Sequence, residues 1–110
     1  MAAAYRGYLN NSIGFGSAAN ANRVIAEGLD SFETLAEYDK DDVASLCRAI
    51  RKDNANLMPI GPILEKRLVY ASSLAKHYTF YNRPLTDVSL NRERIKHVGE
   101  YMNMMDELKK

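Results

Sequence analysis

The chain has 110 residues, 46% of them hydrophobic, and a net charge of +1. This length suits one domain around one core, and the composition is that of a globular protein rather than a disordered or fibrous one. No apolar run reaches the roughly 20 residues of a membrane-spanning helix, and the start of the sequence lacks the features of a signal peptide. A single cysteine excludes an internal disulfide. We therefore expect a protein of the cytoplasm or nucleus without membrane contact.

Residues 1–17 combine small residues, asparagines and glycines with scattered aromatic and aliphatic ones. Because they show no sustained hydrophobic period, we predict a flexible N-terminal arm with at most one short helix. In this arm Tyr5 and Tyr8, near Arg6, are expected to be free to contact a partner. Residues 18–110 are then expected to form a single helical domain.

Two short helices begin this domain. The first is expected over residues 18–27, with Val24 and Ile25 as apolar anchors and Gly28 as its C-terminal stop. The second is expected over residues 32–38, because Asp30 and Ser31 offer N-terminal caps.

A third helix is predicted from Asp39, a further capping residue, to about Lys52. Its apolar residues recur at i, i+3, i+4 and i+7, which places them on one face: Val43, Leu46, Cys47 and Ile50. Cys47 is therefore expected to pack as a small buried hydrophobe rather than to act as a nucleophile.

A loop over residues 53–62 precedes the long central helix. From this loop three side chains are expected to return to the core: Leu57, Met58 and Ile60. Pro62 suits the first turn of a helix over residues 63–81, which ends before Pro84 because proline disfavours helix in the residue preceding it.

The last helix is predicted over residues 87–110, capped by Thr86 or Asp87. Its apolar residues recur at spacings of three and four, with Tyr101 widening the stripe: Ile95, Val98, Met102 and Met105. Gly99 is a weak point within this helix. The sequence thus predicts an all-α fold, a compact bundle of about five helices with a long C-terminal helix.

Residues that could support catalysis or metal binding are few. Ser73 and Lys76 match the serine-x-x-lysine pattern, but the two further motifs that accompany it in penicillin-recognising enzymes are absent. His77 and His97 lie on different predicted helices, without the close spacing of zinc ligands. We therefore expect a protein that is not an enzyme and has no metal or cofactor.

The order of the charges along the chain indicates two interaction surfaces. An acidic surface is predicted from Glu33, Glu37, Asp39, Asp41 and Asp42. A basic surface is predicted from Arg48, Arg51, Lys52, Lys66 and Arg67. Such surfaces can meet head to tail between copies, although a charge run usually indicates only an ordinary solvated surface.

Residues 20–81 resemble a sterile-alpha-motif-like domain. The likeness lies in Gly28-Leu-Asp-Ser-Phe-Glu-Thr-Leu35, in Asp41-Asp42-Val43 with Leu46, and in Pro59-Ile-Gly-Pro-Ile63 leading into the central helix. It implies two short helices before a longer closing helix, with the helix from about residue 87 as an addition.

A second resemblance is carried by Asp41-Asp-Val-Ala-Ser-Leu-Cys-Arg-Ala-Ile-Arg-Lys52. This run is similar to gag-like N-terminal regions of copia-type retroelements of diatoms and related marine eukaryotes. After it, Asp53-Asn-Ala-Asn56 stands where that pattern has a turn rich in proline and glycine. The resemblance implies a retroelement or viral structural protein.

Both resemblances imply binding. The leading hypothesis is a helical interaction module that self-associates or docks a protein partner. The alternative is a nucleic-acid-binding domain whose basic surface contacts phosphates with help from Arg92, Arg94 and Lys96.

Overall fold

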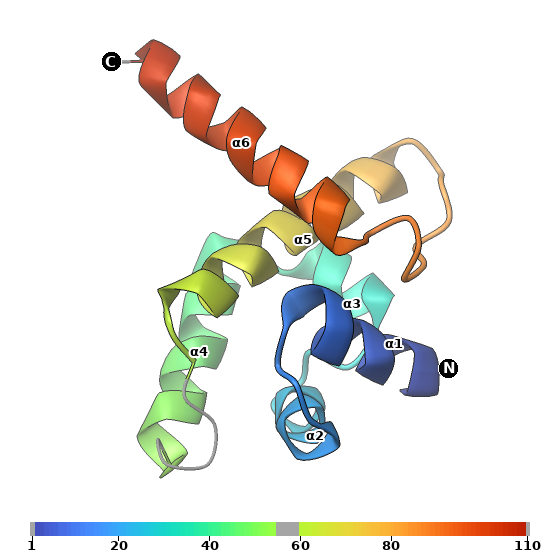
Figure 1. The fold of residues 1–110 in the computed structure, drawn as a ribbon, viewed down its shortest axis with the longest axis vertical. Helices are drawn as coiled ribbons and strands as arrows, with labels where there is room; N and C mark the ends of the chain where they lie inside the picture. Colours follow the sequence, from blue (N-terminus) through green and yellow to red (C-terminus); the bar gives the residue numbers. More distant parts are fainter. Residues whose placement is uncertain (1, 55–59, 110) are drawn as a thin grey trace.

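The computed structural model describes residues 2–54 and 60–109, without the side chains of residues 2, 3, 52–54, 103 and 105–109. Over the described residues the chain is all-helical and forms no strand, which confirms the predicted fold class. Its elements are α1 (Ala2–Tyr8), the π-helical turn η1 (Leu9–Ile13), α2 (Ala18–Ala26), α3 (Phe32–Glu37), α4 (Lys40–Asn54), α5 (Pro62–Phe80) and α6 (Arg92–Lys109) (Figure 1).

Helix α5 is the centre of the bundle. It packs against α3, α4, α6 and η1, so that neighbours cover it on several sides. Its buried residues are correspondingly spread around the helix: Leu68, Ala71, Ser72, Leu74, Ala75 and Tyr78. It begins at Pro62 as predicted, since the first turn of a helix needs no N–H donor there.

The first 17 residues differ from the predicted flexible arm. Five of their side chains are buried in the core: Tyr5, Tyr8, Leu9, Ile13 and Phe15. The Tyr5 hydroxyl donates to the Leu29 carbonyl at 3.0 Å, and the rings of Tyr5 and Tyr8 each lie 5.1 Å from the ring of Phe32, centroid to centroid. The expectation that both tyrosines are free to contact a partner is therefore wrong.

The caps predicted for the early helices are confirmed. The Ser31 hydroxyl accepts a hydrogen bond from the Thr34 amide at 3.1 Å at the start of α3. At the start of α4, the Asp39 carboxylate accepts from the Asp42 amide at 2.8 Å. Gly28 follows α2 with a φ of +113°, the left-handed conformation expected of a C-terminal stop.

Helix α6 begins later than predicted. The amide of Ser89 donates to the Thr86 hydroxyl at 3.0 Å and the amide of Thr86 donates to the Ser89 hydroxyl at 2.9 Å, so these residues form a turn rather than a helix start. Asn91 is the residue that caps α6, because its side-chain oxygen accepts from the Arg94 amide at 3.0 Å. In the loop before α5, Ile60 is buried as predicted, whereas Leu57 and Met58 lie outside the described residues.

Helices α5 and α6 cross closely at Gly99. Gly99 is buried, and a Cβ atom placed on it would lie 2.7 Å from Cε2 of the Tyr70 ring. Beyond this crossing α6 continues away from the other helices (Figure 1). Tyr101, which is expected from the sequence to widen the apolar stripe of this helix, is 59% exposed, and Met104 is 52% exposed, so the stripe is not buried at these residues.

We predict opposite effects from adding one methyl group at two helical glycines. Gly99→Ala forces α6 away from the Tyr70 ring and should lower the free energy of unfolding by about 1–3 kcal/mol. Gly7→Ala, where no atom lies within 4 Å of the added carbon, should raise it by about 0.5–1 kcal/mol through helix propensity. Urea unfolding of both variants measures the free energy of unfolding. A Gly99→Ala protein as stable as wild type would contradict the close approach of α6 to the Tyr70 ring.

Candidate functional site

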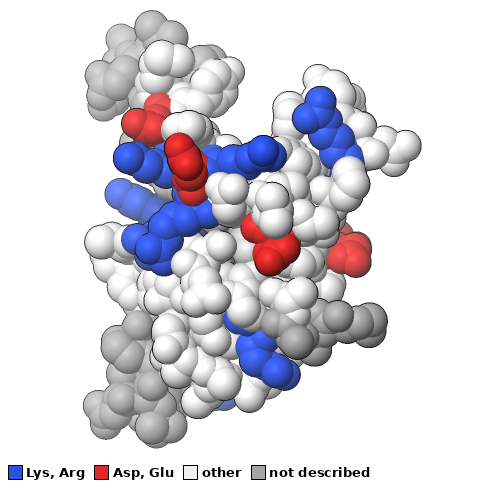
Figure 2. Space-filling view, turned by 45° about the vertical axis from the view of Figure 1, so that its right-hand side comes forward, with Lys and Arg blue, Asp and Glu red and all other residues white. Residues whose placement is uncertain are grey.

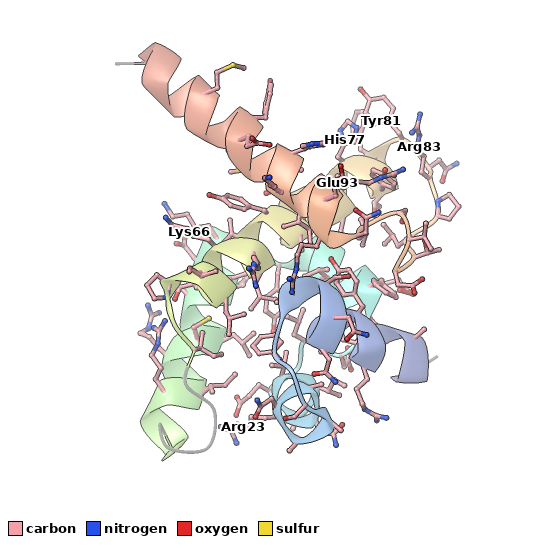
Figure 3. All side chains as sticks on the ribbon, viewed as in Figure 1. Arg23, Lys66, His77, Tyr81, Arg83 and Glu93 are labelled. Carbon is pink, nitrogen blue, oxygen red and sulfur yellow. The ribbon has the colours of Figure 1, made fainter. Side chains whose placement is uncertain are left out.

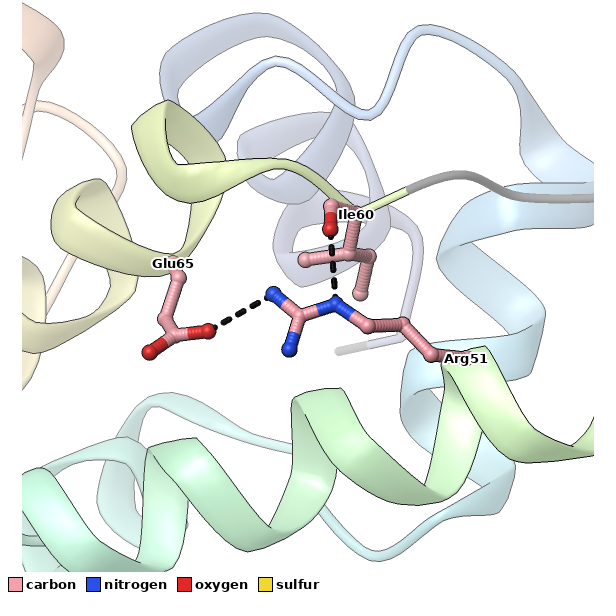
Figure 4. Close-up of polar contacts among 3 residues, drawn as sticks. All are labelled: Arg51, Ile60 and Glu65. Atoms are coloured by element: carbon pink, nitrogen blue, oxygen red, sulfur yellow. Dashed lines mark hydrogen bonds and ion pairs between the residues drawn. The ribbon is translucent and has the colours of Figure 1, made fainter. Parts of the chain in front are cut away.

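The basic surface predicted from the sequence is divided by the fold. Arg51 Nε donates to the Ile60 carbonyl at 2.9 Å, and Arg51 Nη2 forms an ion pair with Glu65 at 2.8 Å (Figure 4). Arg51 therefore holds α4 to the start of α5. Arg48 is exposed and donates to the Ser45 hydroxyl at 3.1 Å, while the side chain of Lys52 lies outside the described residues.

The remaining basic residues fall into two places. Arg67 on α5 and Arg92 on α6 meet at the end of η1, where they donate to the carbonyls of Ile13 and Ser12 at 2.8 Å and 3.0 Å. Lys66 and Lys96 are exposed on the same two helices. Arg94 turns elsewhere and donates to the Tyr78 hydroxyl.

The predicted acidic residues are exposed, but two of them serve as helix caps. Asp39 and Asp42 each accept a hydrogen bond from the other's amide, and the amide of Asp42 holds the pKa of Asp39 below its usual value. Glu37 and Asp42 also line a shallow pocket of about 440 Å³ together with Glu27 and Tyr38. Glu33 and Asp41 do not line this pocket, so the acidic set is not one continuous site.

Ser73 and Lys76 do not form the pair that the serine-x-x-lysine motif requires. Lys76 Nζ instead donates to the Ser72 hydroxyl at 3.0 Å, and both groups donate to the Tyr38 carbonyl just beyond the end of α3. Ser72 is only 2% exposed, so no substrate reaches its hydroxyl. These contacts attach α3 to α5 and offer no catalytic geometry.

A groove of about 720 Å³ lies between α5 and α6. Its floor is apolar and includes Leu74, Val98 and Met102. Its rim carries basic side chains: His77, Arg83, Arg94 and His97. None of the described side chains that line the groove is acidic. The sequence presented the two histidines as isolated residues, and it is the crossing of α5 and α6 that brings them to one groove.

Aromatic rings support the polar rim of the groove. The Arg83 guanidinium lies 6.0 Å from the centroid of the Tyr78 ring, a cation–π distance, and the same tyrosine accepts from Arg94. The His77 ring lies 4.8 Å from the Tyr81 ring at the C-terminal end of α5 (Figure 3). These basic side chains are thus held at the rim and leave the apolar floor open.

An exposed stripe of α6 continues from the groove. His97, Tyr101 and Met104 are spaced by four and three residues, so they lie on one side of the helix. His97 and Tyr101 also line the groove, and all three side chains are exposed. We call the groove together with Tyr101 and Met104 the groove face. It combines an apolar hollow and an apolar ridge on one side of the molecule.

Other features of the described residues do not form a reactive centre. Burial raises the pKa of the Cys47 thiol to about 11, so the thiol is protonated at neutral pH. No group of three histidine, cysteine or acidic side chains in the described residues is placed to hold a metal ion. None of the described helices combines the length and the apolar character needed to cross a membrane.

Comparison with models of protein families, with curated proteins and with solved structures finds no match for this chain. The features of the chain that bear on its function are therefore the groove face and the charged side chains around it.

We predict that two neighbouring serines contribute very differently to stability. Ser72→Ala removes a buried hydroxyl that bonds the end of α3, and should lower the free energy of unfolding by about 1–3 kcal/mol. Ser73→Ala, at the groove, should change it by less than about 0.5 kcal/mol. Thermal or urea unfolding measures both, and equal effects would contradict the assignment of the α3 contact to Ser72.

Proposed function

We propose that the chain is a self-association module. In the pair, α6 of each copy lies against the groove face of the other copy, and the two α6 helices are antiparallel. The observation that carries this proposal is the exposed apolar stripe of α6 beside an apolar groove. A two-fold symmetric pair uses the same surface on both copies, so that surface must offer both a ridge and a hollow. The groove face has both, with Tyr101 and Met104 as the ridge and the α5–α6 groove as the hollow.

The length of α6 also favours a second helix beside it. Its 18 residues span about 27 Å, but its contact with α5 centres on Ile95, Val98 and Gly99. Most of the stability of a helix in a protein comes from packing of its apolar side chains. The α6 helix of a second copy would cover Tyr101 and Met104, which are exposed in the single copy.

The charges along α6 favour an antiparallel arrangement. Residues 92–98 include three residues that are Lys or Arg and one acidic residue, whereas residues 99–109 include three acidic residues and one lysine. Antiparallel pairing therefore sets the basic half of one helix beside the acidic half of the other. Arg94 and His97 at the groove rim belong to the basic half.

Association through the groove face is expected to depend on salt differently from association through the acidic and basic surfaces expected from the sequence. Association driven by exposed charges weakens as salt screens them, whereas burial of an apolar ridge is much less sensitive to salt. Because Arg51 is bound to Glu65 and Asp39 is engaged as a cap, the groove face is the stronger candidate. A role in a retroelement or viral structural protein stays a prediction from resemblance alone.

We expect Tyr101→Glu to prevent association. The substitution places a charge in the apolar ridge, while the 59% exposure of Tyr101 leaves the fold of the single copy unaffected. Light scattering over a range of concentrations should show the wild-type mass rising towards that of two copies, at both low and moderate salt. The dissociation constant of the variant should be at least about ten times higher.

Ile63→Glu is the matched control, because Ile63 is 65% exposed but lies in the first turn of α5, outside the groove lining. It should associate like wild type. A wild-type chain that stays monomeric at all concentrations would refute the proposal. Equal loss of association in both variants would refute the groove face as the contact.

A further inference from the structure

Two arginines from different helices converge on Gly14, at the end of η1. Arg67 Nη1 donates to the Ile13 carbonyl at 2.8 Å, and Arg92 Nε donates to the Ser12 carbonyl at 3.0 Å. A Cβ atom on Gly14 would lie 2.7 Å from Arg67 Nη1 and 3.2 Å from Arg92 Nη2. The two guanidinium groups therefore lie over the same residue, within a few ångströms of each other.

Two lysines extend this pair of positive charges. Lys96 stands one helical turn after Arg92, on the same side of α6. Lys66 adjoins Arg67 in the sequence of α5, and both lysines are exposed. We call these four residues the Arg67–Arg92 patch. Figure 2 shows one group of Lys and Arg side chains with acidic side chains beside them, and further basic side chains elsewhere on the face in view. Within the described part of the chain, no carboxylate forms an ion pair with any of the four.

The hydrogen bonds from Arg67 and Arg92 to the carbonyl groups of η1 explain only part of the positive charge in the patch. Carbonyl groups at the end of a helix attract positive charge, and each arginine uses one N–H group to satisfy one of them. A guanidinium group has five N–H donors in a fixed fork, so most donors of both arginines are left for another acceptor. Neither lysine takes part in a described contact with η1. The patch therefore gathers more positive charge than attachment of η1 requires.

We propose that the Arg67–Arg92 patch binds phosphate groups of a nucleic-acid strand. Guanidinium groups bind phosphate through paired N–H donors, and the flanking lysines supply point charges for neighbouring phosphates. The patch is local, which agrees with a chain whose net charge is only +1. On α6 it occupies a different side from His97, Tyr101 and Met104, so it does not depend on the proposed self-association.

The test is the binding of a fluorescently labelled 20-nucleotide single-stranded RNA to the full chain, followed by anisotropy at low salt. Wild type should bind, with log K falling against log salt by a slope of up to about −3 for four phosphate contacts. The double variant Lys66→Glu with Lys96→Glu should bind at least ten times more weakly. Because neither lysine contacts η1, its fold should be unchanged, and its circular dichroism should match that of wild type.

The control is Lys40→Glu with Arg48→Glu, which changes the net charge by the same amount on α4, away from the patch. It should bind within about two-fold of wild type. Undetectable binding by wild type at low salt, or an equal loss in both double variants, would overturn the proposal. Chemical shifts of the patch that respond to inorganic phosphate but not to RNA would also overturn it, since the site would then serve small phosphates alone.

Discussion

The close crossing of α5 and α6 is the constraint on which the rest of the surface depends. The two helices approach because Gly99 has no side chain and the ring of Tyr70 fills the space where a Cβ would stand. Since α3, α4 and η1 cover other sides of α5, α6 has only one side of it left to pack against. Helix α6 leaves a groove on one flank of the crossing and continues past the bundle with Tyr101 and Met104 exposed.

Much of the fold follows from local sequence signals. The caps at Ser31 and Asp39 and the start at Pro62 are confirmed because capping depends on residues within one turn of each other. The prediction of a flexible arm over residues 1–17 is wrong. The asparagines and glycines of this segment are typical of a loop, but Tyr5, Tyr8, Leu9 and Ile13 have the spacing of one helix face and are buried. The start of α6 was misplaced because Thr86 and Ser89 bond to each other in a turn that imitates a cap.

The candidate site was much less predictable, because its residues come from two helices. A charge run identifies exposed residues but does not show that Arg51 reaches Glu65 or that Arg67 and Arg92 meet over Gly14. These contacts are long-range and depend on the crossing. In the proposed pair of copies, the Arg67–Arg92 patch is present twice, and two linked patches hold one strand more tightly than either alone. The two proposals are independent, yet together they describe a module that joins protein copies and contacts phosphate.

Self-association through the groove face is tested most directly by detecting contact between the α6 helices of two copies. In a mixed sample of isotope-labelled and unlabelled chains, isotope-filtered nuclear Overhauser spectra report only distances between different copies. Pairing through the groove face predicts signals between the Tyr101 ring of one copy and the methyl groups of Val98 and Met102 of another copy. Val98 and Met102 line the groove. Signals confined to other surfaces, or none at a concentration where the mass has doubled, would contradict it.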